Sequence, residues 1–305
     1  MAAEFCVRPA HLEDAAEITA LHRSTVEGAA APAASLLERW RQGGPWMAVE
    51  SCAVHLNHLL RTPGRYVFVA EQAGRVVGEL EAYLSHEAAP FGGLHLALLY
   101  VHRDHQQQGI GSALMGRLVA LAVELGLPQI TTQPEPEAES FYRRHGFRPW
   151  LTLWEMQAEA KGRWRQRLRA LPAWEEPPSR LALRIGRYQC GPQEWENLFP
   201  PLCLPGWSDL PRRIWKTHLR GVPVVLALRR QLNDRSQADG FAWLPPELPL
   251  EPAIEALQAL AAEEGYAAVD LLLPQAEARR GQREGRLAFQ TNLQLWRRPV
   301  GVEQA

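Results

Sequence analysis

The sequence predicts an α+β protein in which helices flank a mixed, mostly antiparallel β-sheet, and it predicts that this arrangement is duplicated. Two patterns and the chain length support this fold class. In the first half, short alternating β-rich segments are interspersed with segments of helical periodicity. Residues 257–265 resemble residues 118–126, and the two segments end on Gly126 and Gly265, 139 residues apart. A length of 305 residues allows two domains, each with its own core.

Composition excludes several classes of protein. The 33 basic and 34 acidic side chains give a formal net charge of −1, which argues against nucleic acid as the main partner. No stretch of about 18 apolar residues is present, and the first residues lack the pattern of a secretion signal, so no membrane partner is expected. The four cysteines form no C-x-x-C pair, which favours reduced thiols and a cytoplasmic location.

The near-zero net charge is a cancellation between two halves. Residues 1–156 carry 12 Lys and Arg against 17 Asp and Glu, whereas residues 157–305 carry 21 against 17. Nine of the ten histidines also lie in the first half. Residues 174–179, Trp-Glu-Glu-Pro-Pro-Ser, read as an extended connector because consecutive prolines stop a helix. We therefore predict a first domain at 1–156, a linker at 157–180 and a second domain at 181–305.

The first elements of the chain are predicted from periodicity and turn residues. A strand at 5–8 precedes Pro9 and a helix whose apolar side chains are Leu12, Ala15, Ile18 and Leu21. Residues 25–60 form a long excursion with a helix at 54–60. A hairpin follows, with strands at 66–71 and 76–84 around the turn at 72–75.

A strand, a loop and a helix come next, and they hold the most informative motif. The strand at 94–101 leads through the loop at 102–108 into a helix with an apolar stripe, which ends at Gly126. A strand at 129–133, a helix at 138–144 and a strand at 149–156 complete the first half. In the second half, a helix at 253–264, a strand at 267–273 and a segment at 289–296 repeat this closing part.

Residues 106–112, Gln-Gln-Gln-Gly-Ile-Gly-Ser, lie between a predicted strand and a predicted helix. The free amides of a first helical turn and the positive end of the helix dipole form an anion site there. Gly109 and Gly111 allow a phosphate or pyrophosphate to approach the backbone closely. The third glycine of a dinucleotide-binding fingerprint is replaced by Leu114, and no Gly-Lys-Ser/Thr of a P-loop follows.

At this motif the sequence resembles the GCN5-related N-acetyltransferase (GNAT) family. The family's signature Gln/Arg-x-x-Gly-x-Gly/Ala is matched by Gln106, Gly109 and Gly111, after a fitting strand at 98–101. The family's opening and closing motifs match in the right order at 7–10 and 138–147. The resemblance implies the acyl-CoA N-acyltransferase fold. The second half lacks the glycine signature and is similar to the degenerate copy of tandem members.

The resemblance also implies roles for individual residues. The backbone of the strand would pair with pantetheine and polarise the thioester, the loop amides would hold the pyrophosphate, and Ser140 would lie near the cofactor. The implied acetyl-CoA contacts are Leu99, Tyr100, Val101, Gln106, Gln107, Gln108, Gly109, Ile110, Gly111, Ser112 and Ser140. Tyr142 takes the position of the general acid that protonates the leaving thiolate. Glu135 stands where many members have asparagine.

An amine acceptor must lose a proton, so a base is required. His95 lies 11 residues before Gln106, at the spacing where the resemblance implies a base, and a near-neutral pKa would suit that role. Glu79 and Glu81, on one face of the preceding strand, are the alternatives. His102 and His105 have no third ligand nearby, so no metal is expected, and His55 and His58 are expected on a solvated helix face.

These features lead to one hypothesis and one alternative. The hypothesis is an N-acetyltransferase that uses acetyl-CoA as cosubstrate and transfers acetyl to a primary amine by direct attack in a ternary complex. The alternative is a module that senses acyl-CoA without catalysis. Trp40 and Trp46 either wall the acceptor site or anchor the core. The amine is not identified by the sequence, and either a monomer or a homodimer is expected.

Overall fold

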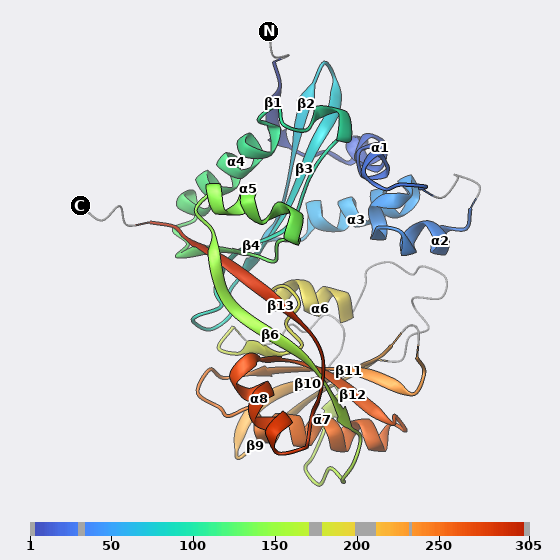
Figure 1. Cartoon of the computed structure of the whole chain (residues 1–305), viewed down its shortest axis with the longest axis vertical. Coiled ribbons are helices and arrows are strands. Elements are labelled where there is room, and N and C mark those ends of the chain that lie inside the picture. Colours follow the sequence, from blue (N-terminus) through green and yellow to red (C-terminus); the bar gives the residue numbers. More distant parts are fainter. Residues whose placement is uncertain (1–3, 30–33, 171–178, 199–211, 232–233, 302–305) are drawn as a thin grey trace.

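The computed structural model describes residues 4–29, 34–170, 179–198, 212–231 and 234–301. Residues 174–178 of the predicted connector and Cys203 lie outside the described residues. Figure 1 shows an upper body built from the start of the chain and a lower body built mainly from its end. The three described cysteines are free thiols.

The first half follows the predicted order of elements, with two further helices in the excursion. Its elements are β1 (Cys6–Pro9), η1 (Leu12–Asp14), α1 (Ala15–Thr25), α2 (Leu36–Arg41), η2 (Gly44–Met47), α3 (Val49–Arg61), β2 (Arg65–Gln72), β3 (Arg75–Ser85), β4 (Gly93–Val101), η3 (Arg103–His105), α4 (Ile110–Glu124), β5 (Gln129–Thr132), η4 (Pro136–Ala138), α5 (Glu139–Arg144) and β6 (Arg148–Glu159).

The second half contains the predicted helix and strand near its end and several strands that the sequence patterns did not resolve. Its elements are β7 (Arg169–Ala170), β8 (Ala182–Ile185), α6 (Gly191–Leu198), β9 (Arg212–Leu219), β10 (Val222–Arg230), β11 (Gln237–Leu244), α7 (Glu251–Glu263), β12 (Ala268–Pro274), α8 (Gln275–Arg283) and β13 (Ala288–Pro299).

All the described strands belong to one sheet. The strand order is β1-β2-β3-β4-β5-β13-β6-β12-β11-β10-β9-β7, and β8 pairs with β11. The parallel pairs are β4 with β5 and β11 with β12, and one α-helix lies in the connection of each pair. The other pairs are antiparallel. The predicted mixed, mostly antiparallel sheet flanked by helices is therefore confirmed.

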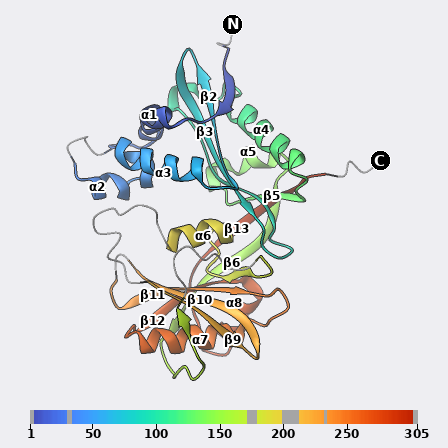
Figure 2. The same cartoon turned by 180° about the vertical axis from the view of Figure 1, so that it is seen from behind.

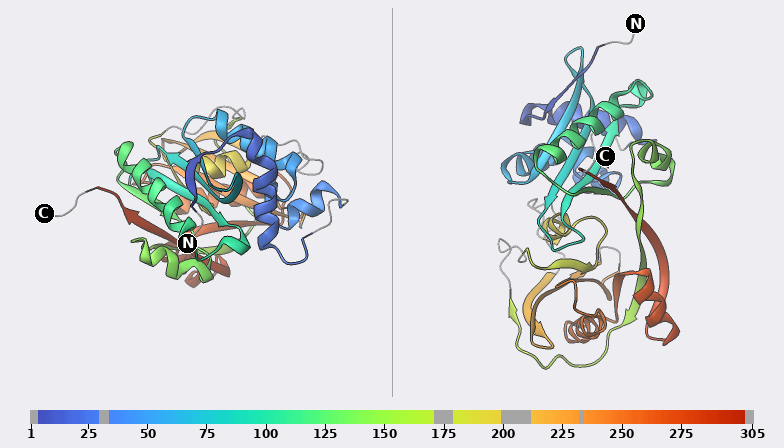
Figure 3. Two further views of the ribbon diagram at one scale, coloured as in Figure 1. Left: turned by 90° about the horizontal axis from the view of Figure 1, so that it is seen from above. Right: turned by 90° about the vertical axis from the view of Figure 1, so that its left-hand side faces the viewer.

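The two halves share strands at the centre of this sheet. The last strand of the chain, β13, lies between β5 and β6, with Trp296 opposite Thr132 on one side and opposite Pro149 on the other. β6 in turn pairs with β12 of the second half from Leu153 to Glu159. Figure 1 and the right view of Figure 3 show β6 and β13 running between the two bodies. The C-terminal strand thus completes the sheet of the first half.

Helices cover both faces of the sheet of the first half. Side chains of β3 point alternately to these two faces, so each face buries apolar residues beneath its helices. Leu80 and Ala82 join the core beneath α4 and α5, whereas Tyr83 joins the core beneath α1 and α3. Gly78 allows α4 to pack closely, since an added Cβ would lie 2.8 Å from a side-chain atom of Ile110. Figure 2 shows α1 and α3 on one side and α4 on the other.

Polar contacts also join the halves beside the sheet. α6 of the second half lies between the two bodies (Figure 2), and its Glu196 accepts a hydrogen bond from Arg65 Nε of β2 at 2.7 Å. The same carboxylate lies 3.3 Å from His58 Nε2 of α3. His58 was expected on a solvated face, and this expectation is wrong because α6 covers that end of α3.

Candidate active site

The strands β4 and β5 diverge and leave part of β4 without a strand partner on one side. They pair in parallel only where Leu94 to Leu96 face Ile130 to Thr132. One residue later the register between β3 and β4 shifts at Ala97, which makes a β-bulge and turns the strand. Backbone groups of β4 beyond this point face an opening, where a bound ligand can pair with them as an added strand would.

A cleft of about 760 Å³ occupies this opening. Its lining includes β4 from Leu96 to Val101, among them the predicted Leu99, Tyr100 and Val101. Gln106 also lines the cleft, and its side-chain amide donates to the Val101 carbonyl oxygen at 3.3 Å. The predicted cosubstrate strand is thus placed along the wall of a cavity.

The loop that follows β4 presents the first turn of α4 to solvent. Gly109 immediately precedes the helix with φ +86°, a left-handed conformation that glycine adopts without strain. Gln107 and Gln108 are exposed, and Gln107 has φ +61°, which is uncommon for a residue with a side chain. Ile110 is buried in the core, so only its backbone N–H is available at the helix start. These amides lie where the sequence predicts an anion site, and anion binding there stays a prediction.

The remaining predicted contacts differ in exposure. Ser112 lies in the first turn of α4, and its hydroxyl is 3.1 Å from His145 Nε2. An added Cβ on Gly111 would contact the Phe141 ring at 3.4 Å, so α5 lies close behind the anion site. Ser140 is exposed on α5.

Tyr142 lines the cleft from α5 and is 8% exposed. Burial raises the pKa of Tyr142 to about 12, although a hydrogen bond with Thr132 of β5 acts in the opposite direction. The phenol is therefore protonated at neutral pH, as a proton donor must be. Its role as general acid stays a prediction.

The two candidate carboxylates lie on the opposite face of the sheet from Tyr142. Glu79 and Glu81 are 1% and 2% exposed and share the face of β3 that α1 and α3 cover. Glu79 Oε2 lies 2.6 Å from His22 Nε2. Glu81 accepts from Trp46 Nε1 at 2.9 Å and lies 3.1 Å from His55 Nε2. His55 was expected to be solvated, which is wrong because its ring is turned inward to this buried carboxylate.

His95 lines the cleft near the start of β4, with Nδ1 3.0 Å from Thr131 Oγ1. Burial, with a contribution from Arg187, lowers the pKa of His95 to about 3. The near-neutral pKa expected from the sequence is not found. An imidazole with this pKa is a weak base, which disfavours the predicted role of His95 as proton acceptor.

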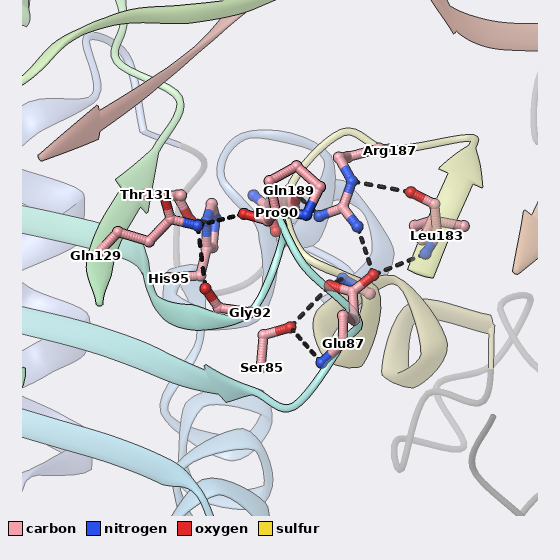
Figure 4. A network of polar contacts seen from close by, with 11 residues as sticks. Ser85, Glu87, Pro90, Gly92, His95, Gln129, Thr131, Leu183, Arg187 and Gln189 are labelled. Carbon is pink, nitrogen blue, oxygen red and sulfur yellow. Dashed lines mark hydrogen bonds and ion pairs between the residues drawn. The ribbon is translucent and has the colours of Figure 1, made fainter. Parts of the chain in front are cut away.

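The second half reaches the cleft through a short loop that the first half holds in place. Arg187 and Glu87 form a buried ion pair across the halves, shown in Figure 4. Glu87 also accepts from the backbone N–H groups of Leu183 at 2.7 Å and Gly191 at 2.9 Å. Arg187 donates to the Gln189 carbonyl oxygen at 3.2 Å. Tyr188 and Gln189 of this loop line the cleft.

His22 was missed by the sequence reasoning, although it lines the cleft. A signal was present: it follows Ile18 and Leu21 at helical spacing, so it falls on the buried face of α1. A polar residue on an apolar helix face needs a buried partner, but the partner Glu79 is 57 residues away in sequence. Trp46 lines the same part of the cleft.

The described residues offer neither a cluster of metal ligands nor a membrane-spanning helix. The described residues contain no group of three or more His, Cys, Asp or Glu side chains that could hold a metal ion. None of the described helices is both long and apolar enough to cross a membrane.

The diverging strands, the glycine-led helix and the buried tyrosine define an acyl-CoA N-acyltransferase fold. Residues 63–149 match the family model of the acetyltransferase (GNAT) domain. The matched residues run from β2 to the start of β6 and include the whole of the predicted anion site. Members of that family bind acyl-CoA, and the match supports an acyltransferase.

Solved structures extend the fold similarity over the whole chain. A GCN5-related N-acetyltransferase from Anabaena variabilis has a TM-score of 0.60 at 11% identity, over 98% of this chain and 73% of that chain. One from Kribbella flavida has a TM-score of 0.57 at 11% identity, over 97% and 71%. At these identities the comparison shows the fold alone. Among curated proteins, none matches the sequence significantly.

Proposed function

We propose that this protein is an N-acetyltransferase that moves an acetyl group from acetyl-CoA to a primary amine by direct attack in a ternary complex. One observation supports this most strongly: a single cleft joins the unpaired backbone of β4, the protonated Tyr142 and the aromatic wall at Trp46. A donor and an acceptor can therefore meet in the opening between β4 and β5.

The residues of the chain would divide the chemistry as follows. Acetyl-CoA supplies the activated thioester. The amides at the start of α4 bind its pyrophosphate, and backbone N–H groups of β4 donate to the carbonyl oxygen, each contributing on the order of 3 kcal/mol as negative charge develops there. Tyr142 gives its proton to the departing sulfur. We place the reaction in the cytoplasm, because free thiols suit a reducing compartment.

The test is turnover against a panel of primary amines. Purified protein is incubated with acetyl-CoA and each amine, free thiol is followed, and the N-acetyl product is identified by mass. We expect saturable thiol release with at least one amine class and matching product. Tight acetyl-CoA binding without turnover on any amine would favour the non-catalytic sensor instead.

A further inference from the structure

The geometry points to His22, backed by Glu79, as the group that takes the proton from the acceptor amine. This inference rests on the proposed function and assigns a catalytic residue that the sequence patterns did not identify. His22 lies on α1 and lines the cleft, and its ring stacks on Trp46 at 5.2 Å and contacts Tyr100 at 4.6 Å between ring centroids. It therefore stands where an acceptor entering beside Trp46 would meet β4.

Glu79 holds the imidazole of His22 through one ring nitrogen and leaves the other ring nitrogen to act as the base. Glu79 Oε2 is 2.6 Å from His22 Nε2. Burial raises the pKa of Glu79, and the hydrogen bond with His22 acts in the opposite direction. We assign the ionised carboxylate, to which a neutral imidazole donates through Nε2 while it keeps its lone pair on Nδ1. Once Nδ1 accepts a proton, the carboxylate beside it stabilises the imidazolium. The other oxygen, Glu79 Oε1, is buried and has no hydrogen-bond partner among the described residues. A buried carboxylate with so few hydrogen bonds is stabilised by a positive charge beside it. Glu79 therefore favours a proton on the His22–Glu79 pair.

The neighbouring acid–base groups are less suitable. Glu81 already accepts from Trp46 and interacts with His55, and His55 is not among the residues that line the cleft. His95 lines the cleft but holds its proton too weakly to serve as base at neutral pH. His22 combines access to the cleft with a free lone pair and a carboxylate partner.

The groups that surround the pair come from five elements. These are Thr19 on α1, Trp46 on η2, Cys52 and His55 on α3, Glu81 on β3, and Tyr100 on β4. The charged groups that face the pair thus lie on β3 and α3.

The proton balance is complete with groups already named. The nitrogen–carbon bond forms as the carbon–sulfur bond breaks, one amine proton passes to His22 Nδ1, and the proton of Tyr142 passes to sulfur. His22 then loses its proton to solvent and Tyr142 regains one, so the net reaction is amine and thioester to amide and thiol. An acceptor that enters as an ammonium loses its extra proton through the same pair beforehand.

The experiment compares His22→Gln with His55→Gln, since both remove a buried imidazole that is paired with a carboxylate. We expect His22→Gln to lower kcat about 100-fold or more with acetyl-CoA affinity nearly unchanged, and His55→Gln to change kcat less than about threefold. The acidic limb of the kcat/KM pH profile should disappear in His22→Gln, so that activity rises with pH towards the pKa of the amine.

A second variant separates the role of Glu79 from a structural one. Glu79→Gln removes the charge that stabilises the imidazolium, so the acidic limb should move to lower pH, whereas Glu81→Gln should move it less. If His22→Gln does not fold, nitrogen-detected NMR of the unaltered protein still decides the matter. A neutral His22 protonated on Nδ1, or an unchanged limb in either His22→Gln or Glu79→Gln, would overturn the inference. Absence of turnover in the unaltered protein would instead overturn the proposed function.

Discussion

The starts of α4 and α7 occupy the same place in two parallel strand–helix–strand units, yet their chemistry is opposite. α4 follows a left-handed Gly109 and has no acidic residue in its first turn. α7 begins with Glu251 and Pro252. The hydrogen bond from its own backbone N–H, together with Arg280 at 2.6 Å, holds the pKa of Glu251 below its usual range. Pro252 has no N–H to donate.

This difference makes the two strand–helix–strand units unequal as places for an anion to bind. The positive end of α7 is occupied by the chain's own carboxylate, whereas the positive end of α4 faces solvent. The second half contributes in other ways. It supplies β13 to the sheet of the first half and the loop of Tyr188 and Gln189 to the cleft. The comparison therefore predicts one cosubstrate site with a wall from each half.

The largest predicted effect concerns the contact that fixes this wall. Glu87→Gln leaves Arg187 buried without its counter-charge, so we expect the free energy of unfolding to fall by about 3–5 kcal/mol. Chemical denaturation monitored by tryptophan fluorescence measures the change. If strands β6 and β13 alone joined the halves, Glu87→Gln would lower the free energy of unfolding only as much as the loss of an exposed ion pair does.

Two further variants serve as controls for that measurement. Glu139→Gln removes one partner of an exposed i,i+4 pair with Arg143 and should cost no more than about 0.5 kcal/mol. The double variant with Glu87→Gln and Arg187→Met removes both buried charges and should recover part of the lost stability. A double variant less stable than Glu87→Gln alone would contradict this account of the interface.

The second prediction concerns Tyr142, the proposed proton donor of the first half. Tyr142→Phe should lower kcat about 100-fold and leave acetyl-CoA affinity nearly unchanged, because only the hydroxyl is lost from a ring that stays buried. Steady-state kinetics and calorimetric binding measure the two quantities. Tyr66→Phe, in the same core but on β2, is the matched control. A collapse of acetyl-CoA binding in Tyr142→Phe would contradict the acid role.

The sequence predicted the local parts of this site and missed the long-range ones. Gly109 and the first turn of α4 follow from residues adjacent in the chain, so their pattern is visible directly. The pairing of His22 with Glu79 spans 57 residues, and that of Glu87 with Arg187 spans 100, so no local periodicity reports them. β13 fills the gap between β5 and β6. That gap exists only once the rest of the sheet has assembled, so no local pattern predicts where β13 goes.

A third prediction transfers the chemistry of α7 to α4. Ser112→Glu places a carboxylate in the exposed first turn of α4. There the carboxylate repels a bound pyrophosphate, but it interacts favourably with the positive end of the helix dipole. We expect acetyl-CoA to bind about tenfold more weakly, with stability unchanged or slightly raised. Titration calorimetry at low and high salt measures this, and Ser112→Gln is the control. Equal affinity of the two variants at low salt would place the pyrophosphate elsewhere.

The smallest predicted effect is on stability. It distinguishes the left-handed backbone of Gly109 from the mere absence of a side chain there. An added Cβ would meet no atom within 4 Å at either Gly109 or Gly116, but only Gly109 has positive φ. Gly109→Ala should therefore cost about 1 kcal/mol of stability. Gly116→Ala, within α4, should gain about 0.5–1 kcal/mol, because alanine is the better helix former. Opposite signs in thermal unfolding would show that the start of α4 requires a left-handed residue, and equal signs would contradict it.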